Sequence, residues 1–240
     1  MCGRFASSHS PEQIAEFFGA RFEGEALAVS YNVAPTNDVY GVVALPDSQR
    51  EVQTYHWGLV PSWAKDIKVG AKMINARAET LGEKPAFKTL FQKRRLIVPM
   101  DGFYEWRSAR EGAPLTKSGK PAKTPLYIHR SDGEPLAVAG LWATWHDQAA
   151  GPDAPWLHSC TLITTSANSL LASVHDRMPV VLPESAWAQW LDPANHDLSS
   201  LQRLLVPADD GVLTMHEVST EVNNVRNKGA ELVEPVTKTA

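Results

Sequence analysis

Cysteine is scarce in this chain, which has two of them, Cys2 and Cys160, in 240 residues. Such a number excludes a disulfide framework, and neither cysteine belongs to the CxxC spacing typical of metal sites. No apolar run reaches the roughly 20 residues of a membrane span, and no basic segment followed by an apolar stretch marks a signal peptide. We therefore expect a cytoplasmic protein that works without membrane contact, metal or cofactor.

Positive charge is not in excess either. The chain carries 23 lysine and arginine residues against 27 aspartate and glutamate residues, a net charge of −4. This balance argues against a protein that grips nucleic acid over its whole surface, although it allows a local basic cleft. The stretch KTLFQKRR, residues 88–95, gathers Lys88, Lys93, Arg94 and Arg95. It is typical of a solvated helix face, and it could equally line such a cleft.

Four segments carry helical signals. In residues 10–19, Ser10 precedes Pro11 and Gln13, the pattern of a capping box with proline in the first turn. Gly19 suits the left-handed position that ends a helix. Apolar residues at helical spacing predict three further helices, over 84–95, 183–191 and 197–205.

Short runs rich in β-branched and aromatic residues lie between these helices, at 39–45, 51–60, 94–100, 102–106, 125–130, 135–145 and 160–166. They are too short and too closely spaced for repeated βαβ units. We predict an α+β fold in a single domain over 1–240, built on a curled, largely antiparallel mixed sheet that is barrel-like, with peripheral helices. The polar stretches 108–124 and 147–155 are expected to be surface loops or hairpin tips.

The position of Cys2 is unusual, because chain ends are normally frayed and dispensable. Cys2 is either a small apolar residue packed in the first strand or, once Met1 is removed, a residue with a free amine and a free thiol on adjacent carbons. The sequence around it, MCGRF, does not decide between the two.

Polar residues interrupt several apolar runs. Asn75, Arg77 and Glu79 alternate along MINARAET, as on a solvent-facing strand edge or along one side of a site. Glu105 lies between two aromatic residues in FYEW. Strand alternation could point it at water, whereas burial would disfavour its charged form and suit a proton-transfer group.

Two further clusters have both a structural and a functional interpretation. His175, Asp176 and Arg177 precede an apolar strand, at the kind of junction where loops carry chemistry. Trp57 and Trp63 flank Pro61 in HWGLVPSW; tryptophans are usually core residues, but an exposed one could stack on an unpaired base.

Taken together, seven blocks form an ordered set: CGRF, YNVAPT, WGLVPSW, INARAET, DGFYEW, VHDRMPVVL and VNNVRNKGAELVEPV. The set closely resembles the SOS response-associated peptidase (SRAP) family of abasic-site processing proteins, from position 2 to about position 236. The fold of that family, a single α+β domain on a curled mixed sheet, agrees with the fold expected from the residues.

The resemblance implies roles for individual residues. In the family, the cysteine exposed by methionine removal bonds covalently to an abasic site in single-stranded DNA, and Cys2 matches it. Asn75 matches the residue that holds the crosslink and the opened sugar, Glu105 the catalytic carboxylate, and His175 the histidine that handles the sugar hydroxyl. The implied DNA contacts are Arg4, Arg77, Thr164 and Trp63, and Arg177 is a further candidate to line the groove. Ala64 stands where some members have a second tryptophan.

The chemistry explains why such a cysteine must be N-terminal. An amine converts the open-chain aldehyde of an abasic site to an imine, and only a 1,2-aminothiol can then close a thiazolidine ring. An α-amine titrates near about 7.7–8.0, so a useful fraction is already nucleophilic at neutral pH. The expected partner is DNA with an abasic site, in a single strand or at a single-strand/double-strand junction, and we expect the protein to be a monomer.

Two other functions fit the same sequence. An N-terminal-nucleophile amidohydrolase or peptidase would also use a mature N-terminal cysteine with its own amine as base. A DNA-binding module without catalysis would only shield single strands, reversibly and with strong salt dependence.

Overall fold

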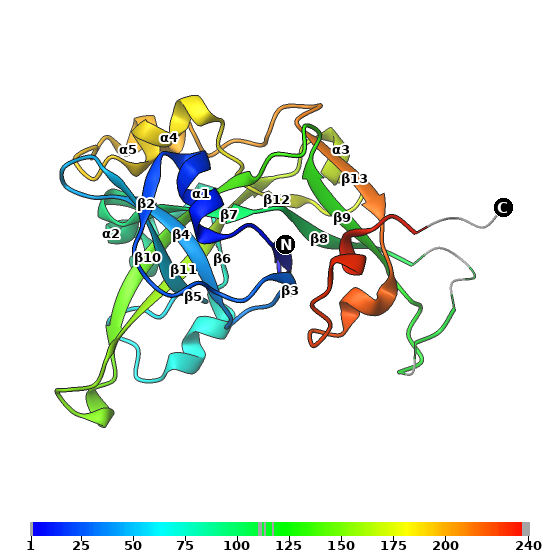
Figure 1. The fold of residues 1–240 in the computed structure, drawn as a ribbon, viewed down its shortest axis with the longest axis horizontal. Coiled ribbons are helices and arrows are strands. Elements are labelled where there is room, and N and C mark those ends of the chain that lie inside the picture. The colour runs from blue at the N-terminus through cyan, green and yellow to red at the C-terminus, as the bar shows by residue number, and fades with distance from the viewer. Residues whose placement is uncertain (1, 110–111, 113, 117, 237–240) are drawn as a thin grey trace.

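The computed structural model describes residues 2–109, 112, 114–116 and 118–236 (Figure 1). Its centre is a barrel of five strands in the order β11–β10–β7–β4–β5, closed because β5 also pairs with β11. The closing pair is parallel and the other pairs are antiparallel. The five strands are β4 (Asp38–Ala44), β5 (Arg50–Trp57), β7 (Arg95–Met100), β10 (Leu136–His146) and β11 (Trp156–Ser166).

Three short strands pair with the ends of the barrel strands β5 and β11. β2 (Ala20–Phe22) pairs in parallel with β5, and β6 (Asn75–Arg77) pairs in parallel with β11. β12 (Arg177–Pro179) pairs antiparallel with β11. β6 and β12 both meet β11 at Thr164, so the strands that carry the expected site residues converge there.

A second, antiparallel sheet lies beside the barrel, to its right in Figure 1, in the order β13–β9–β8–β1–β3. Its strands are β1 (Phe5–Ser7), β3 (Ser30–Val33), β8 (Gly102–Arg107), β9 (Thr124–Arg130) and β13 (Leu213–Glu217). β1 lies between β3 and β8, so the residues just before it are brought close to β8.

The helices form where the sequence predicts them. They are α1 (Pro11–Phe18), α2 (Pro85–Lys93), α4 (Glu184–Leu191) and α5 (Leu198–Gln202), with an additional single turn, α3 (Ser169–Ala172). α1 has both bonds of the predicted capping box, between Ser10 and Gln13, and ends at Gly19 with φ +56°. Short 3-10 turns cover Ile67–Lys72, Ala78–Thr80, Gln148–Ala150, Thr220–Asn223 and Ala230–Val233.

The two faces of the barrel wall are packed differently. The outer face packs against α1, α2, α4 and α5 through residues such as Ile14, Phe91 and Trp190. The inner face continues into the second sheet, in one buried cluster that contains Cys2 and Phe103. Cys2 is therefore buried in the core between barrel and sheet.

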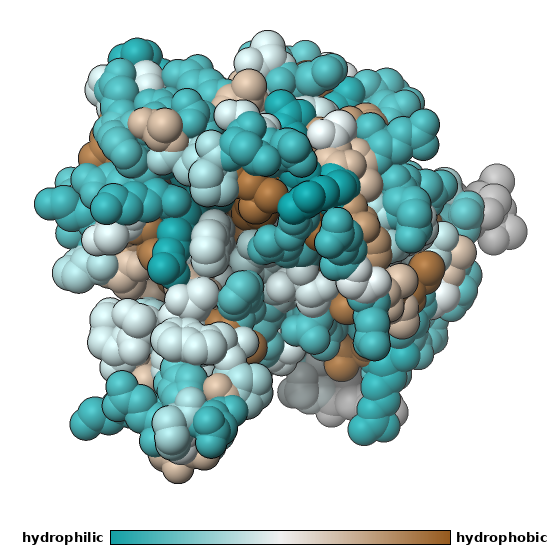
Figure 2. All heavy atoms as spheres, turned by 60° about the vertical axis from the view of Figure 1, so that its left-hand side comes forward, coloured by the Kyte–Doolittle hydropathy of each residue, from teal (hydrophilic) through white to brown (hydrophobic). Residues whose placement is uncertain are grey.

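The expected α+β, barrel-like fold is confirmed, with two sheets in place of one. The stretch 108–124 connects β8 and β9, although residues 110, 111, 113 and 117 lie outside the described part, and 147–155 connects β10 and β11. None of the described helices is long and apolar enough to cross a membrane. The face in Figure 2 is mostly hydrophilic, with apolar residues in small separate patches. That one domain extends over residues 1–240 stays a prediction.

The expectation that Arg95 could line a basic cleft is wrong. Arg95 is 4% exposed, and its guanidinium donates to backbone carbonyls at the ends of two helices. The acceptors are Phe91, Gln92, Trp190, Asp192 and Asn195. Carbonyls at helix C-termini lack partners within the helix, and a buried arginine supplies five N–H donors to them.

Candidate active site

Cys2 lies three residues before the start of β1 and has no exposed surface. Its backbone carbonyl accepts a hydrogen bond of 2.8 Å from Nδ2 of Asn75, the first residue of β6. The other side-chain atom of Asn75, Oδ1, is buried and accepts no hydrogen bond from the described residues. The asparagine thus holds the N-terminal segment with its amide nitrogen and keeps an oxygen for another donor. Met1, whose removal the sequence predicts, lies outside the described residues.

Glu105 is buried next to this cysteine. It lies in β8, is 5% exposed, and by strand alternation faces the same side as Phe103, toward the cluster that contains Cys2. Burial raises the pKa of the Cys2 thiol well above its usual range, and the negative charge of Glu105 raises it further. Of the two orientations that the sequence allows for Glu105, toward water or buried, the structure has the buried one. A protonated thiol beside a buried carboxyl can pass its proton over a short path.

His175 lies three residues after the end of α3, and its Nδ1 is within hydrogen-bonding distance of two groups. The backbone N–H of Arg177 lies 3.0 Å away and Oδ1 of Asp176 lies 2.8 Å away. A neutral ring accepts the Arg177 N–H at Nδ1 and carries its own proton on Nε2, whereas a protonated ring donates from Nδ1 to Asp176. Either protonation state has a partner, and Nε2 makes no hydrogen bond to the described residues. The ring can therefore give or take a proton at Nε2.

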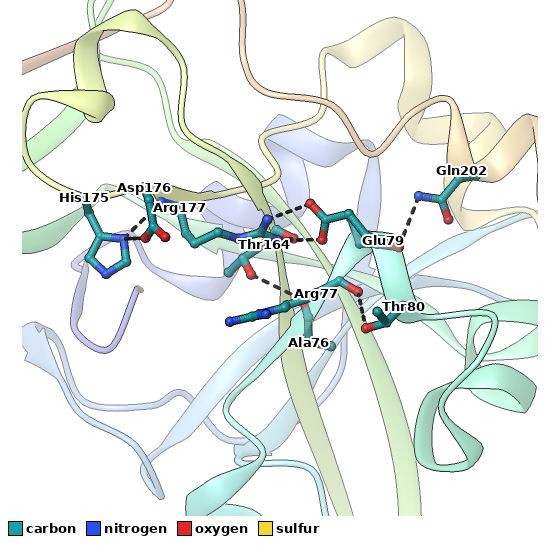
Figure 3. Close-up of polar contacts among 10 residues, drawn as sticks. Ala76, Arg77, Glu79, Thr80, Thr164, His175, Asp176, Arg177 and Gln202 are labelled. Atoms are coloured by element: carbon teal, nitrogen blue, oxygen red, sulfur yellow. Dashed lines mark hydrogen bonds and ion pairs between the residues drawn. The ribbon is translucent and has the colours of Figure 1, made fainter.

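Thr164 and Arg77 lie beside this histidine, paired across β11 and β6. Thr164 is fully buried, and its hydroxyl is 3.4 Å from the carbonyl of Ala76. Arg77 is exposed and makes no ion pair within the described part of the chain. Figure 3 shows its guanidinium extending toward the side on which His175 lies. Arg77 is thus the cation of this group that is open to a ligand.

Arg177 is arranged differently. Its guanidinium binds both carboxylate oxygens of Glu79, at 2.6 and 2.9 Å, and the carbonyl of Thr164 at 2.6 Å. The strand alternation of side chains expected along MINARAET ends at Arg77, the last residue of β6. Glu79 lies in the 3-10 turn that follows. Arg177 belongs to the site but is occupied by an internal partner, so a phosphate contact by it stays a prediction.

Arg4 is also hydrogen-bonded within the protein, through one nitrogen of its guanidinium. Nη1 donates to Oδ1 of Asn32 at 2.7 Å and to the carbonyl of Val222 at 2.9 Å. Asn32 is fully buried, and its Nδ2 reaches the carbonyls of Val222, Asn224 and Asn227. Asn32 lies in the YNVAPT block but was not predicted as a site residue, because the carbonyls that its Nδ2 reaches lie more than 180 residues away in the chain. Together these bonds fasten the C-terminal segment to the strand that follows Cys2.

The two tryptophans of the WGLVPSW block take opposite positions. Trp57 is fully buried, packs against Phe5 at a ring distance of 5.0 Å, and donates to the carbonyl of Ile74. Trp63 is 65% exposed, so it is the one that could stack on a base. Ala64 is buried, which leaves Trp63 without an aromatic neighbour in sequence on that surface.

Nearly the whole chain matches a known family. The model of the SOS response associated peptidase (SRAP) family matches residues 1–225. This chain belongs to the SRAP family. The abasic site processing protein YoqW of Bacillus subtilis is 40% identical over 98% of this chain and 99% of its own length. YedK of Escherichia coli, which has the same descriptive name, is 32% identical over 98% of this chain.

Relatives of the SRAP family also exist beyond bacteria and among solved structures. HMCES of Xenopus tropicalis, likewise named an abasic site processing protein, is 30% identical over 96% of this chain and 77% of its own length. A crystal structure of a Bacteroides thetaiotaomicron protein has the same fold, with a TM-score of 0.83 and 26% identity over 98% of this chain. The SRAP blocks recognised in the sequence fall on the elements described above.

The structure brings seven of the nine expected SRAP residues into two linked groups, whereas Arg4 is bonded to Asn32 and Val222 and Trp63 lies exposed outside both. Cys2, Asn75 and Glu105 form one, and Arg77, Thr164, His175 and Arg177 form the other. β6 joins them, because it carries both Asn75 and Arg77. No cluster of three or more histidine, cysteine, aspartate or glutamate side chains able to hold a metal occurs among the described residues.

Proposed function

We propose that this protein processes abasic sites in DNA by trapping them covalently through Cys2. Membership of the SRAP family supports a role in the response to DNA damage, since the relatives are named abasic site processing proteins. The observation that carries the proposal is the position of Cys2. Its carbonyl is bonded to Asn75 and its thiol lies under the influence of Glu105. A buried backbone carbonyl needs a partner in any case, but a cysteine that served only as packing would not need a carboxylate beside its thiol.

The proposed reaction starts with loss of Met1, which frees the α-amine of Cys2. The amine adds to the C1′ aldehyde of the opened sugar, and the adduct loses water to give an imine. The Sγ–H then adds across the imine: sulfur bonds to carbon, the proton ends on nitrogen, and a five-membered thiazolidine forms. Both nucleophiles belong to one residue, so the second step gains the advantage of proximity.

His175 and Glu105 divide the proton transfers between them. His175 can donate from Nε2 to the sugar oxygen as the ring opens, with either protonation state stabilised at Nδ1. Glu105 can accept the thiol proton and return it to the nitrogen, since it is buried beside Cys2. Asn75 keeps Oδ1 for the opened sugar. Arg77 and Trp63, both exposed, are available for a phosphate and a base.

One incubation separates this function from its rivals. Protein is mixed with single-stranded DNA that carries one abasic site and is run on a denaturing gel, beside Cys2→Ala and beside undamaged DNA. We expect a heat-stable adduct that needs both Cys2 and the lesion. No adduct but salt-sensitive binding would instead support the shielding module. Turnover of a peptide or amide without an adduct would support the amidohydrolase.

A further inference from the structure

Three strands meet where the second group of site residues is built. β6 and β12 lie on opposite sides of β11, and Thr164 pairs with Arg77 on one side and with Pro179 on the other. Each outer strand has three residues. Few backbone hydrogen bonds therefore fix either strand, and proline lacks an N–H to contribute.

The ion pair of Glu79 and Arg177 spans these strands. Glu79 follows β6, Arg177 opens β12, and their bidentate contact crosses the strand between them, as Figure 3 shows. Nη2 of Arg177 also donates to the carbonyl of Thr164 in β11. A single guanidinium thus connects all three segments.

This contact differs from an ordinary surface ion pair, which contributes little to stability. The Arg177 side chain is only 13% exposed, although that of Glu79 is 51% exposed. Nε of Arg177 is buried and has no hydrogen-bond partner among the described residues. Without Glu79, a mostly buried cation would lose its counter-charge, and we expect it to turn toward solvent. The hydrogen bond from Arg177 also lowers the pKa of Glu79.

The backbone of the same arginine holds the histidine. The N–H of Arg177 donates to Nδ1 of His175, which fixes the ring and places the proton of a neutral imidazole on Nε2. We infer that the Glu79–Arg177 pair is a brace that positions His175 for the abasic-site reaction. Glu79 is then a positioning residue, and the inference rests on the function proposed above.

The brace and the alternative role of Arg177, as a phosphate ligand, predict different results for Glu79→Gln. If Arg177 binds phosphate, loss of the competing carboxylate frees it, and affinity for undamaged single-stranded DNA rises. If the pair is a brace, affinity changes less than about twofold, while adduct formation at saturating DNA slows about tenfold or more, because misplaced groups react slowly.

The test is a double-mutant cycle of Glu79→Gln and Arg177→Gln. Glu83→Gln serves as the control, since Glu83 is an exposed glutamate four residues away that loses the same charge. We expect each single variant to slow adduct formation about tenfold and the double variant to be no slower than either, because the two side chains act as one unit. The defect should shrink on an analogue whose aldehyde cannot cyclise, since His175 serves ring opening. Losses that multiply, an unchanged rate, or tighter DNA binding by Glu79→Gln would overturn the brace.

A DNA-free measurement keeps this inference separate from the proposed function. If the wild-type protein forms no adduct, the proposed function fails, and the brace is judged by NMR alone. In Glu79→Gln we expect faster hydrogen exchange of the Arg177 amide and shifted ring signals of His175, with Glu83→Gln like wild type. An Arg177 amide that stays fully protected in Glu79→Gln would contradict the brace.

Discussion

Asn75 is the residue that joins the two groups of the site, because its Nδ2 holds the Cys2 carbonyl while its buried Oδ1 has no hydrogen-bond partner among the described residues. An amide suits this place since it offers a donor and an acceptor without charge. A carboxylate there would set an oxygen against the Cys2 carbonyl, and an alanine would leave that carbonyl without its partner.

We therefore expect both Asn75→Ala and Asn75→Asp to slow adduct formation about tenfold or more, with a loss of about 1 kcal/mol in the free energy of unfolding for the alanine variant. The rates come from time courses on denaturing gels and the stability from urea titration. Asn37→Ala is the control, since Asn37 accepts a hydrogen bond within an exposed turn. Asn75→Asp reacting at the wild-type rate would show that the donor to Cys2 is not needed.

At the scale of residues, the sequence predicts candidate side chains for the chemistry but not what those side chains touch. The burial of Glu105 was open because strand alternation does not say which face is buried. The exposure of Trp63 was open because nothing in HWGLVPSW says which of its two tryptophans is exposed. The partner of Arg177 could not be predicted, since Glu79 lies 98 residues earlier in the chain. Such contacts follow from sheet pairing over long distances, which local patterns do not encode.

At the scale of elements, the helices were predictable because their signals are local. The capping box and Gly19 of α1 lie within the segment they delimit. The parallel pairing of β5 with β11, which closes the barrel, joins segments about a hundred residues apart and has no local signal. The role of Arg95 was missed for the same reason, because the α4 carbonyls that it binds come from a distant element.

Arg95 gives a prediction at this scale. Because it satisfies carbonyls at the ends of α2 and α4, Arg95→Met should lower the free energy of unfolding by on the order of 3 kcal/mol. Lys93→Met removes the same charge from an exposed position and should change it by less than about 0.5 kcal/mol. Urea titrations of both variants make the comparison. Equal small losses would mean that Arg95 does not tie the helices together.

At the scale of the whole molecule, the buried tyrosine and cysteine side chains make the stability of the fold depend on alkaline pH, all in the same direction. Burial raises the pKa of the hydroxyls and thiols of Tyr55, Tyr104, Tyr127, Cys2 and Cys160 above their ordinary values. In the unfolded chain these groups ionise near about 8.5 for cysteine and 10 for tyrosine. Above those values the folded state keeps protons that the unfolded state has lost, so stability falls as pH rises.

We expect the free energy of unfolding to decline progressively between about pH 8.5 and pH 10.5, as measured by urea titration at each pH. Tyr127→Phe should make the decline near pH 10 shallower, by up to about 1.4 kcal/mol per pH unit for one proton. A stability that is flat over this range, or an unchanged slope in Tyr127→Phe, would show that these groups ionise as readily in the folded protein.

The most direct test of the proposed chemistry is the intact mass of the adduct with an abasic single strand. We expect the mass of the protein without Met1, plus that of the full-length DNA, minus one water, because imine formation releases one water and ring closure releases nothing. A variant with one uncleaved residue before Cys2 should give no heat-stable adduct, since the Cys2 nitrogen is then an amide and the new terminal amine has no thiol on the adjacent carbon. An adduct that retains Met1, or one formed equally by Cys2→Ala, would contradict a thiazolidine at Cys2.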